Sequence, residues 1–320
     1  MANFHHADPF LPGNATSAGS GRVIESGPED HIFVYYSDHG GRRFLFFPTG
    51  GVLHANHLND AINNMHATNR YAKMVIYVEA CHSGSMFYHR LSSERNVYVV
   101  TAADPWESSF SCCYDPSRHT FLGDQFSRKW MRDTEHDHDI RGEWLEAQYE
   151  NTRSTVKQSH ISRYGDINGM RYMMVGDFQG ASQRRNVVTD LVPAWDVPYQ
   201  ALLKELEITN TTEGRLRVLE KMKLEESMRL KTQETWKKIA MKVSGDMDVL
   251  KMQKSEVLTD DVSVDECYEG SVDEYLRACR VQDREGSEYR LKDVFVFENL
   301  CNKGVGKDVI KEAIRDVCSE

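Results

Sequence analysis

Two apolar segments that do not alternate with polar residues constrain the fold more than any other feature of this sequence. They are Ile32–Tyr36 and Met74–Val78. Such runs are typical of strands buried on both faces, as in a parallel sheet. Reactive and polar residues follow each run at once, Asp38-His39-Gly40 after the first and Glu79-Ala80-Cys81 after the second. Because open α/β sheets carry their chemistry at the carboxyl ends of such strands, we predict a functional site there.

The segment between these two runs has helical periodicity. Leu58, Ile62 and Met65 recur at helical spacing, which predicts a helix from Asn56 to about Tyr71. A strand, a helix and a second parallel strand form a right-handed crossover unit. We therefore expect His39 and Cys81 to open on the same edge of one sheet.

The rest of the first half predicts further elements of the same domain. A third strand at Val97–Thr101 follows quickly, and the polar and aromatic segment Ser108–Asp124 is typical of a loop that lines a pocket. The remaining expected elements are helices near Gln125–Met131 and Gly142–Ser154 and a strand at Met170–Val175.

The pattern changes in the second half. Gly180–Pro198 is irregular and contains two prolines, so we place a domain boundary there. Gly214–Val243 mixes apolar residues with charges of both signs and predicts one or two long helices. Ser271–Glu274 has capping-box form before an apolar run, and Val309–Val317 predicts an amphipathic closing helix. The second domain is thus expected to be small and helical.

Composition and charge exclude several classes of partner. The 320 residues carry a net charge of −10 and contain no basic stripe, which argues against nucleic acid and anionic membranes. We find no run of the ~20 apolar residues that a membrane helix needs. His136 and His138 alternate in a charged segment and are more typical of solvated residues than of ligands. We assign neither a metal nor another cofactor.

The cysteines suggest an oxidising compartment. Cys267, Cys279, Cys301 and Cys318 are well spaced without paired CxxC steps, which is typical of disulfides and leaves three connectivities open. The adjacent Cys112 and Cys113 are interpreted as loop or core thiols. The amino terminus lacks the features of a signal peptide, so we expect that the chain lacks its natural start.

Cys81 and His39 fit the roles of a nucleophilic pair. A thiolate attacks carbonyls, and a nearby imidazole favours the thiolate and later protonates the departing amine. Gly40 lacks a Cβ, so its N–H can approach a substrate and, with the N–H of Cys81, hold a developing oxyanion. An isolated cysteine and histidine are more often structural. The strand context, Gly40 and the Ser83-Gly84-Ser85 sequence favour catalysis.

These residues resemble a known family. Asp38-His39-Gly40, the Glu79–Ser85 segment, Thr101-Ala102-Ala103 and Glu107-Ser108-Ser109 are similar to the legumains, which are asparaginyl endopeptidases. The resemblance runs from about Gly19 to the end. It implies an α/β fold with a caspase-like, mostly parallel sheet flanked by helices, whose first strands are missing, and a small all-α prodomain stapled by disulfides.

The resemblance also implies domains and site residues. The implied ranges are an unmatched segment 1–18, a catalytic domain 19–180, an activation linker and helix 181–255, and a prodomain 256–320. The implied roles are nucleophile for Cys81, general base and acid for His39, oxyanion donor for Gly40, substrate pocket for Glu79, Ser109 and Asp124, and disulfides Cys267–Cys301 and Cys279–Cys318. A pocket carboxylate such as Asp124 accepts from an asparagine amide.

A zymogen follows from the same resemblance. The family cleaves after asparagine, and after aspartate at acid pH, in lysosomes or vacuoles. The prodomain is expected to inhibit the catalytic domain, and Asn210 in the linker is the expected activation site. The other implied partners are polypeptide substrates, with cystatin-type inhibitors as further candidates.

Two departures support a rival hypothesis. His82 replaces the glutamate usual after the nucleophile, and we expect its side chain to point to solvent rather than to lower the thiol pKa. Nothing in Met1–Ala18 matches the asparagine and the basic residue of the family's first strands. The chain is then expected to expose the edge of Ile32–Tyr36 and to be poorly soluble and weakly active.

The rival is accordingly a catalytically impaired, truncated relative that binds proteins or has no activity. A related transamidase that attaches lipid anchors ranks lower, because its membrane segment is absent and the four-cysteine prodomain is present.

Overall fold

The computed structural model describes residues 24–47, 51–136, 142–180, 191–245, 248–251, 262–281 and 287–319. It divides the chain into two compact units. The first unit comprises Met1–Tyr114 and Phe121–Ala194, and the second comprises Asp115–Thr120 and Trp195–Glu320. We describe each unit by itself.

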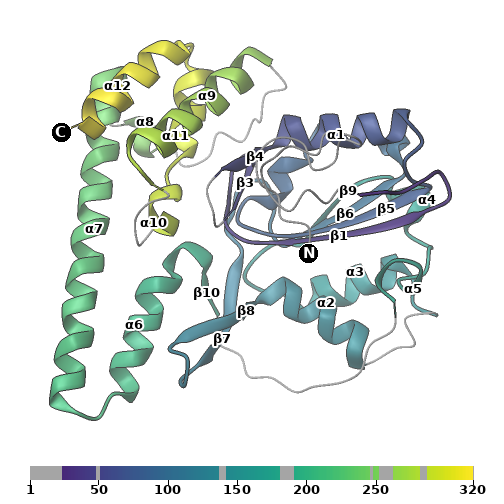
Figure 1. Ribbon diagram of the computed structural model, residues 1–320, viewed down its shortest axis with the longest axis horizontal. Coiled ribbons are helices and arrows are strands. Elements are labelled where there is room, and N and C mark those ends of the chain that lie inside the picture. Colours follow the sequence, from purple (N-terminus) through teal and green to yellow (C-terminus); the bar gives the residue numbers. More distant parts are fainter. Residues whose placement is uncertain are drawn as a thin grey trace. The chain divides into compact units, whose positions relative to one another are not determined.

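The first unit is built around a four-stranded sheet with the order β1-β5-β6-β9 (Figure 1). These strands are β1 His31–Ser37, β5 Lys73–Glu79, β6 Val97–Thr101 and β9 Ser162–Gly165. β1, β5 and β6 are parallel, and β9 pairs antiparallel with β6. The predicted parallel strands are confirmed, as is the crossover helix, which is α1 Ala55–Ala67.

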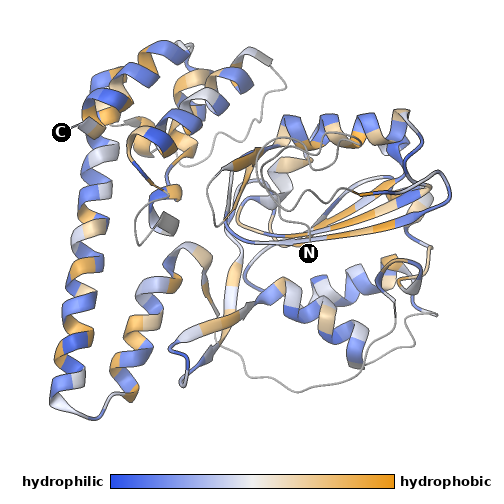
Figure 2. Ribbon diagram, in the orientation of Figure 1, coloured by the Kyte–Doolittle hydropathy of each residue, from blue (hydrophilic) through white to orange (hydrophobic). Residues whose placement is uncertain are grey.

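Helices cover both faces of this sheet (Figure 1). Alternate residues of a strand point to opposite faces, so Met74, Ile76 and Val78 of β5 pack with α1. Val75 and Tyr77 pack instead with two helices on the other face, α2 Gln125–His136 and α3 Leu145–Thr155. The central strands are accordingly apolar along their length (Figure 2). This two-sided burial explains why their sequences show no alternation.

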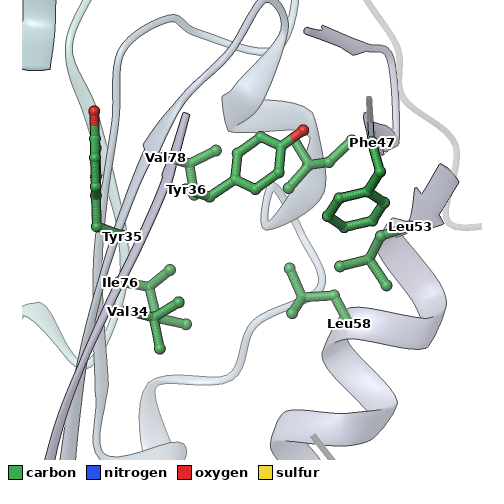
Figure 3. Close-up of a pocket in the computed structure, with 9 residues that line it drawn as sticks. Val34, Tyr35, Tyr36, Phe47, Leu53, Leu58, Ile76 and Val78 are labelled. Carbon is green, nitrogen blue, oxygen red and sulfur yellow. The ribbon is translucent and has the colours of Figure 1, made fainter. Parts of the chain in front are cut away.

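β1 is the edge strand of this sheet among the described residues. Its residues are partly buried or exposed, in contrast to β6 and to β5 beyond Lys73, which are buried. An apolar pocket lies beside it, where Val34 and Tyr36 face Leu53 and Leu58 across a gap (Figure 3). The expected apolar edge at Ile32–Tyr36 is therefore present, and the pocket does not include the reactive residues.

Two small antiparallel sheets adjoin the main one. The first orders β2-β3-β4, and the second orders β10-β7-β8. Their strands are β2 Gly40–Gly41, β3 Phe44–Phe46, β4 Val52–His54, β7 Phe110–Asp115, β8 Thr120–Asp124 and β10 Leu191–Pro193. The prediction of a loop at Ser108–Asp124 is wrong, because most of it forms the β7 and β8 strands. Its aromatic residues pair across them, as Tyr114 does with Phe121.

The predicted strand at Met170–Val175 is also wrong. The segment lies between two short helices, α4 Ile167–Met170 and α5 Gly176–Gln179, and only Met174 makes an isolated bridge, to Trp144. The Asp166 side chain accepts from Gly169 N at 2.9 Å and starts α4 instead of extending a strand. Met170 and Val175 are fully buried, so the apolar run fills the core from a turn.

The second unit consists of helices. They are α6 Val197–Ile208, α7 Thr212–Ser244, α8 Asp248–Lys251, α9 Val262–Ala278, α10 Ser287–Leu291, α11 Phe295–Asn302 and α12 Lys307–Ser319. The predicted long helix and closing helix are confirmed as α7 and α12. Short 3-10 helices are also present: η1 Ser83–Met86 and η2 Ser93–Arg95 lie in the first unit, and η3 Ala194–Asp196 lies where the chain passes from the first unit to the second.

The core of the second unit joins α7 to the last helices. Trp236 of α7 is 1% exposed, and its ring contacts Tyr275 and Phe297 at centroid distances of 4.7 and 5.0 Å. The predicted capping box at Ser271 is wrong, because Ser271 lies inside α9. There its hydroxyl donates to Cys267 O at 2.8 Å, one turn back.

Cross-links and ion pairs stabilise this helical core. The structure joins Cys267 to Cys301 and Cys279 to Cys318, the pairing that the resemblance implies. Arg229 on α7 bonds Asp196 at 2.6 Å and Glu225 at 3.0 Å. Among the described helices, none has the length and apolar character to cross a membrane.

Candidate active site

The register of β1 and β5 brings His39 and Cys81 to the same edge. Ser37 pairs with Glu79 at the carboxyl ends of the two parallel strands. Asp38 N donates to Glu79 O at 3.2 Å, which extends the pairing by one step. His39 and Cys81 each follow two residues after the last paired residue. The expected convergence of the two loops thus follows from strand pairing.

Gly40 lies directly against the loop that holds Cys81. A Cβ at this position would stand 2.6 Å from Cys81 O and 2.9 Å from Ala80 Cβ. Both distances are far below van der Waals contact, so a side chain would push the two loops apart. Glycine here lets the backbone next to His39 touch the backbone of Cys81.

Cys81 is a free thiol in a buried position. All seven cysteines lie within the described residues, and the other six are in disulfides. The Cys81 side chain lies beside Ser109, with 3.8 Å between Sγ and Oγ. Burial raises the pKa of the thiol, the nearby Asp124 carboxylate raises it further, and hydrogen bonds with Ser109 and Ser108 lower it. These surroundings keep the resting thiol protonated.

His82, the residue after Cys81, has a fixed place in the structure. Its backbone is left-handed, with φ of 56°, and its N–H donates to Glu107 O at 2.7 Å. The ring is half-buried, and Nδ1 lies 3.2 Å from Pro105 O. The expectation that the side chain points to solvent is therefore wrong, because the ring packs against the Pro105 carbonyl.

Glu79 is a buried carboxylate at the start of α2. Its Oε2 accepts from Ser127 N at 2.7 Å and from Ser127 Oγ at 3.0 Å. A helix amino terminus favours a carboxylate in this place. Oε1 is buried without a hydrogen-bond partner in the part of the chain that the structure describes. Burial, with a smaller effect of Asp124, holds the pKa of Glu79 well above its usual range.

Asp124 connects the other site residues. It ends β8, and its Oδ1 accepts from Ser111 Oγ at 2.6 Å. Burial raises the pKa of Asp124, while the Ser111 hydrogen bond and the charge of His39 lower it. Asp124 also acts on the pKa of both Cys81 and Glu79. Three predicted site residues, His39, Glu79 and Cys81, thus interact electrostatically with this carboxylate, while Ser109 lies beside Cys81 and Gly40 lies against the Cys81 loop.

Sequence reasoning missed the serines that hold these carboxylates. Ser127 anchors Glu79, and Ser111 anchors Asp124. Ser109 directly precedes β7 and Ser111 is its second residue; a spacing of two places them on the same side of an extended segment, a signal that needs the strand to be predicted first. The adjacent Cys112 and Cys113 were interpreted as thiols, but the structure joins them in a disulfide within the same strand.

Other predicted positions lie away from this cluster. Asn210 is exposed between α6 and α7, and the next residue, Thr211, caps α7 by accepting from Gly214 N at 3.1 Å. The side chain of His136 and all of His138 fall outside the described residues.

The sequence comparisons match both parts of the chain. Residues 4–181 match the peptidase C13 family, and residues 220–318 match the legumain prodomain. The first match begins inside the segment 1–18 for which sequence analysis found no counterpart. The second begins within α7.

Curated relatives extend over nearly the whole chain. Legumain of Bos taurus is 36% identical over 94% of this chain and 70% of its own length. Legumain of Homo sapiens is 35% identical over 94% of this chain and 70% of its own length. The hemoglobinase of Schistosoma japonicum is 30% identical over 93% of this chain and 70% of its own length. These matches extend over both units, and a catalytically impaired form is not favoured. The chain belongs to the peptidase C13 family, as a legumain-like cysteine peptidase that carries a legumain prodomain.

Proposed function

We propose that this peptidase cleaves polypeptides after asparagine through an acyl-enzyme on Cys81. His39 removes the thiol proton, and the thiolate attacks the carbonyl carbon of the scissile bond. The N–H groups of Gly40 and Cys81 stabilise the oxyanion. His39 then protonates the departing amine, and water releases the acyl group. The protonated imidazole that forms offsets the burial that raises the pKa of Cys81.

The observation that carries the asparagine preference is a pair of carboxyl groups, that of Glu79, which is buried, and that of Asp124, which is partly buried and acts on the pKa of Cys81. Glu79 has an oxygen without a partner, and Asp124 and Ser109 add further polar atoms. An asparagine side chain offers an NH₂ donor and a carbonyl acceptor to such a pocket. Apolar side chains would leave these buried groups unpaired and are rejected. Aspartate fits only at acid pH, where it loses its charge.

Matched peptides test the specificity. We expect cleavage after asparagine to exceed cleavage after glutamine by roughly 100-fold, and cleavage after aspartate to appear only at acid pH. Asp124→Asn should lower cleavage after asparagine about tenfold or more, because the amide NH₂ then faces another donor. Asp115→Asn, at the other end of the β7 and β8 pair, is the control. Equal rates for asparagine and glutamine would contradict the proposal.

We also propose that the chain is a zymogen. In this proposal residues 19–180 are the catalytic domain, 181–255 the activation linker and helix, and 256–320 the prodomain that inhibits it. Asn210 is the proposed activation site because it is exposed in the link between two helices. Unstructured, exposed positions are the preferred sites of proteolytic cleavage.

Peptide mapping after incubation at acid pH tests this second proposal. We expect a new amino terminus at Thr211 in the wild type, and none in Asn210→Gln. Cys81→Ala should also stay intact if the chain cleaves itself. An intact Asn210–Thr211 bond in an activated wild type would contradict the assignment of the site.

The proposed setting is an acidic, oxidising compartment such as a lysosome or vacuole. The disulfides of the second unit support it, and one relative, from Vicia sativa, is named vacuolar-processing enzyme; it is 43% identical over 51% of this chain and 36% of its own length. Polypeptides are the proposed substrates, the chain's own prodomain is the proposed intramolecular inhibitor, and cystatin-type proteins are proposed as inhibitors in trans. Titration of the acid-treated chain with a cystatin would test the last of these, and undiminished activity would contradict it.

A further inference from the structure

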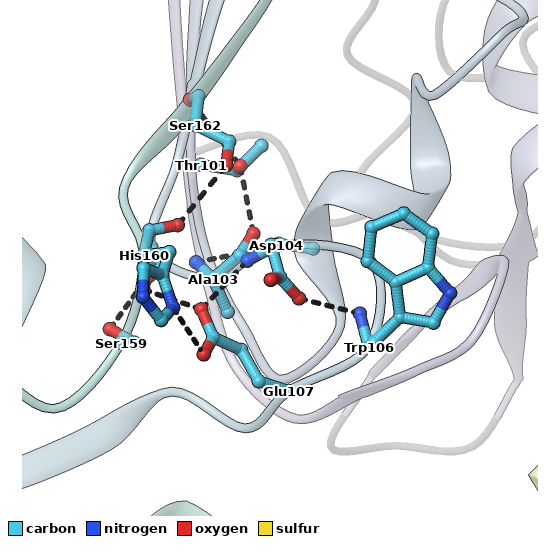
Figure 4. Close-up of polar contacts among 10 residues, drawn as sticks. Thr101, Ala103, Asp104, Trp106, Glu107, Ser159, His160 and Ser162 are labelled. Atoms are coloured by element: carbon cyan, nitrogen blue, oxygen red, sulfur yellow. Dashed lines mark hydrogen bonds and ion pairs between the residues drawn. The ribbon is translucent and has the colours of Figure 1, made fainter. Parts of the chain in front are cut away.

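Several hydrogen bonds meet at Glu107, which lies in the loop 102–109 that follows β6. Its carboxylate accepts from three N–H groups: Asp104 N at 3.1 Å, His160 N, and His160 Nδ1 at 2.9 Å (Figure 4). Ser159 Oγ adds a bond to Ala102 O at 2.6 Å. The loop is thus tied to the segment before β9 at two points.

The same residue contacts the loop that carries Cys81. The backbone oxygen of Glu107 accepts from His82 N at 2.7 Å, directly after Cys81. Ser108 and Ser109, which follow Glu107, supply the hydrogen bonds that lower the pKa of the thiol. A shift of Glu107 would therefore move both the backbone next to the nucleophile and the hydroxyls beside its sulfur.

Hydrogen bonding accounts for this cluster without a bound cation. One ligand atom from each of Asp104, Glu107 and His160 lies within 4.8 Å of the others, a spacing that would suit a metal ion. Both oxygens of Glu107 are already occupied by donors, however, and Asp104 Oδ1 accepts from Trp106 N at 2.7 Å.

The charge of the pair depends on pH. The Glu107 carboxylate raises the pKa of His160 and partial burial lowers it, while Asp104, which raises it, and Arg153 of α3, which lowers it, have smaller effects. His160 is exposed, so solvent screens these effects. At acid pH the imidazolium makes the bond to Glu107 charge-assisted and therefore stronger.

We propose that Glu107 and His160 are positioning residues for the nucleophile, and we call this pair the Glu107 brace. Its hydrogen bonds hold the loop 102–109 so that the Glu107 carbonyl and the two following serines fix the Cys81 thiol. The proposal rests on Cys81 as the nucleophile but not on the preference for asparagine.

Alkylation of Cys81 by iodoacetamide tests the brace without any substrate recognition. The full chain is incubated at acid pH, alkylated between pH 4 and 9, and mapped by mass spectrometry. We expect Glu107→Ala to move the pH profile of Cys81 alkylation and to slow peptide cleavage in kcat by roughly 10- to 100-fold, with KM little changed. In wild type and variant, unfolding temperature is recorded in parallel.

Glu107→Gln provides a sharper variant that keeps the fold. Its amide oxygen still accepts from Asp104 N and His160 N, and its NH₂ donates to a neutral His160 ring. We expect near wild-type alkylation where His160 is neutral and a deficit at acid pH, where an imidazolium faces the NH₂. Glu146→Gln is the matched control, since it breaks a partly buried pair with Arg163 elsewhere in the same unit.

Two results would overturn the inference. A Glu107→Ala profile that coincides with wild type, while unfolding temperature falls as in Glu146→Gln, would reduce the brace to a structural contact. A wild-type Cys81 that resists iodoacetamide at every pH would remove the nucleophile and the proposed mechanism with it.

Discussion

Two buried glutamates, one in each unit, stand in opposite electrostatic surroundings. Glu79 in the first unit is buried near Asp124, and burial holds its pKa well above the usual range. Glu274 in the second unit bonds Arg315 at 3.0 Å and also Arg277, and these cations lower its pKa. Burial thus favours the neutral carboxyl in one unit, and two arginines favour the ionised carboxyl in the other.

Acidification therefore changes the contributions of Glu79 and Glu274 to folding in opposite directions. Glu79 takes up a proton in the folded state at a pH where the unfolded chain does not, so its contribution to folding improves as pH falls toward 4.5. Glu274 stabilises folding above pH 4.5, and that contribution is lost as pH falls below it. Acidification thus relieves a destabilising contribution of Glu79 and removes a stabilising contribution of Glu274.

The largest expected effect is a loss of peptidase activity without a loss of stability in the helical unit. Cys81→Ala should lower peptidase activity by roughly 1,000-fold or more, because the nucleophile is removed. It should leave the helical unit unchanged. Peptide hydrolysis measures the first effect and hydrogen exchange, resolved by peptide, the second. Residual activity within tenfold of wild type would contradict the assigned nucleophile.

Disulfide removal should act on the other unit alone. Replacing Cys279 and Cys318 by serine opens a loop of 39 residues and should destabilise the helical unit by about 2–5 kcal/mol. Replacing Cys112 and Cys113, which are adjacent, opens no loop and is the control. Thermal unfolding, with hydrogen exchange to assign each transition, measures both. A loss of protection in β5 and β6 would contradict this separation.

Glu79→Gln should remove the pH dependence that Glu79 gives to the stability of the first unit. The amide imitates the protonated carboxyl, so the first unit should gain roughly 1 kcal/mol at pH 7 and no longer gain on acidification. Unfolding at pH 7 and pH 4.5 measures this. A variant that is less stable at both values would show that Glu79 is ionised in the folded state.

Glu274→Gln should remove the pH-dependent contribution of Glu274 to the stability of the second unit. Its expected effect is the smallest of the four. Both arginines are more than half exposed, so the loss at pH 7 should stay below about 1 kcal/mol. The difference from wild type should vanish well below pH 4.5. Hydrogen exchange of α9 and α12 at the two pH values is the measurement. A difference that persists at low pH would mean that packing, not charge, is responsible.

Much of the fold is predictable from the pattern of burial. The middle of β5 and most of β6 are apolar because both faces are covered, and α1 and α12 show helical periodicity because one side of each packs on a core. The failures have different causes, since the Asp166 cap starts a helix where a strand was predicted and β7 and β8 form where a loop was predicted. The capping box at Ser271 satisfies the local rule, yet α9 begins earlier and carries it inside.

The two parts of the candidate site differ in how far the sequence predicts them. The loops with His39 and Cys81 follow from two parallel strands, so their convergence needs only the strand order. The contacts of Ser111 and Ser127 with the pocket carboxylates depend on β8 and the start of α2. Because the β7 and β8 strands were missed, the Ser111 contact could not be inferred, and the predicted helix near Gln125–Met131 did not by itself place Ser127 against Glu79.

An asparaginyl electrophile tests most directly whether the two loops act together. After incubation at acid pH, we expect modification of Cys81 alone, at a rate that falls roughly 100-fold in His39→Ala and is unchanged in His57→Ala on the exposed side of α1. Modification of another residue, or an unchanged rate in His39→Ala, would contradict it.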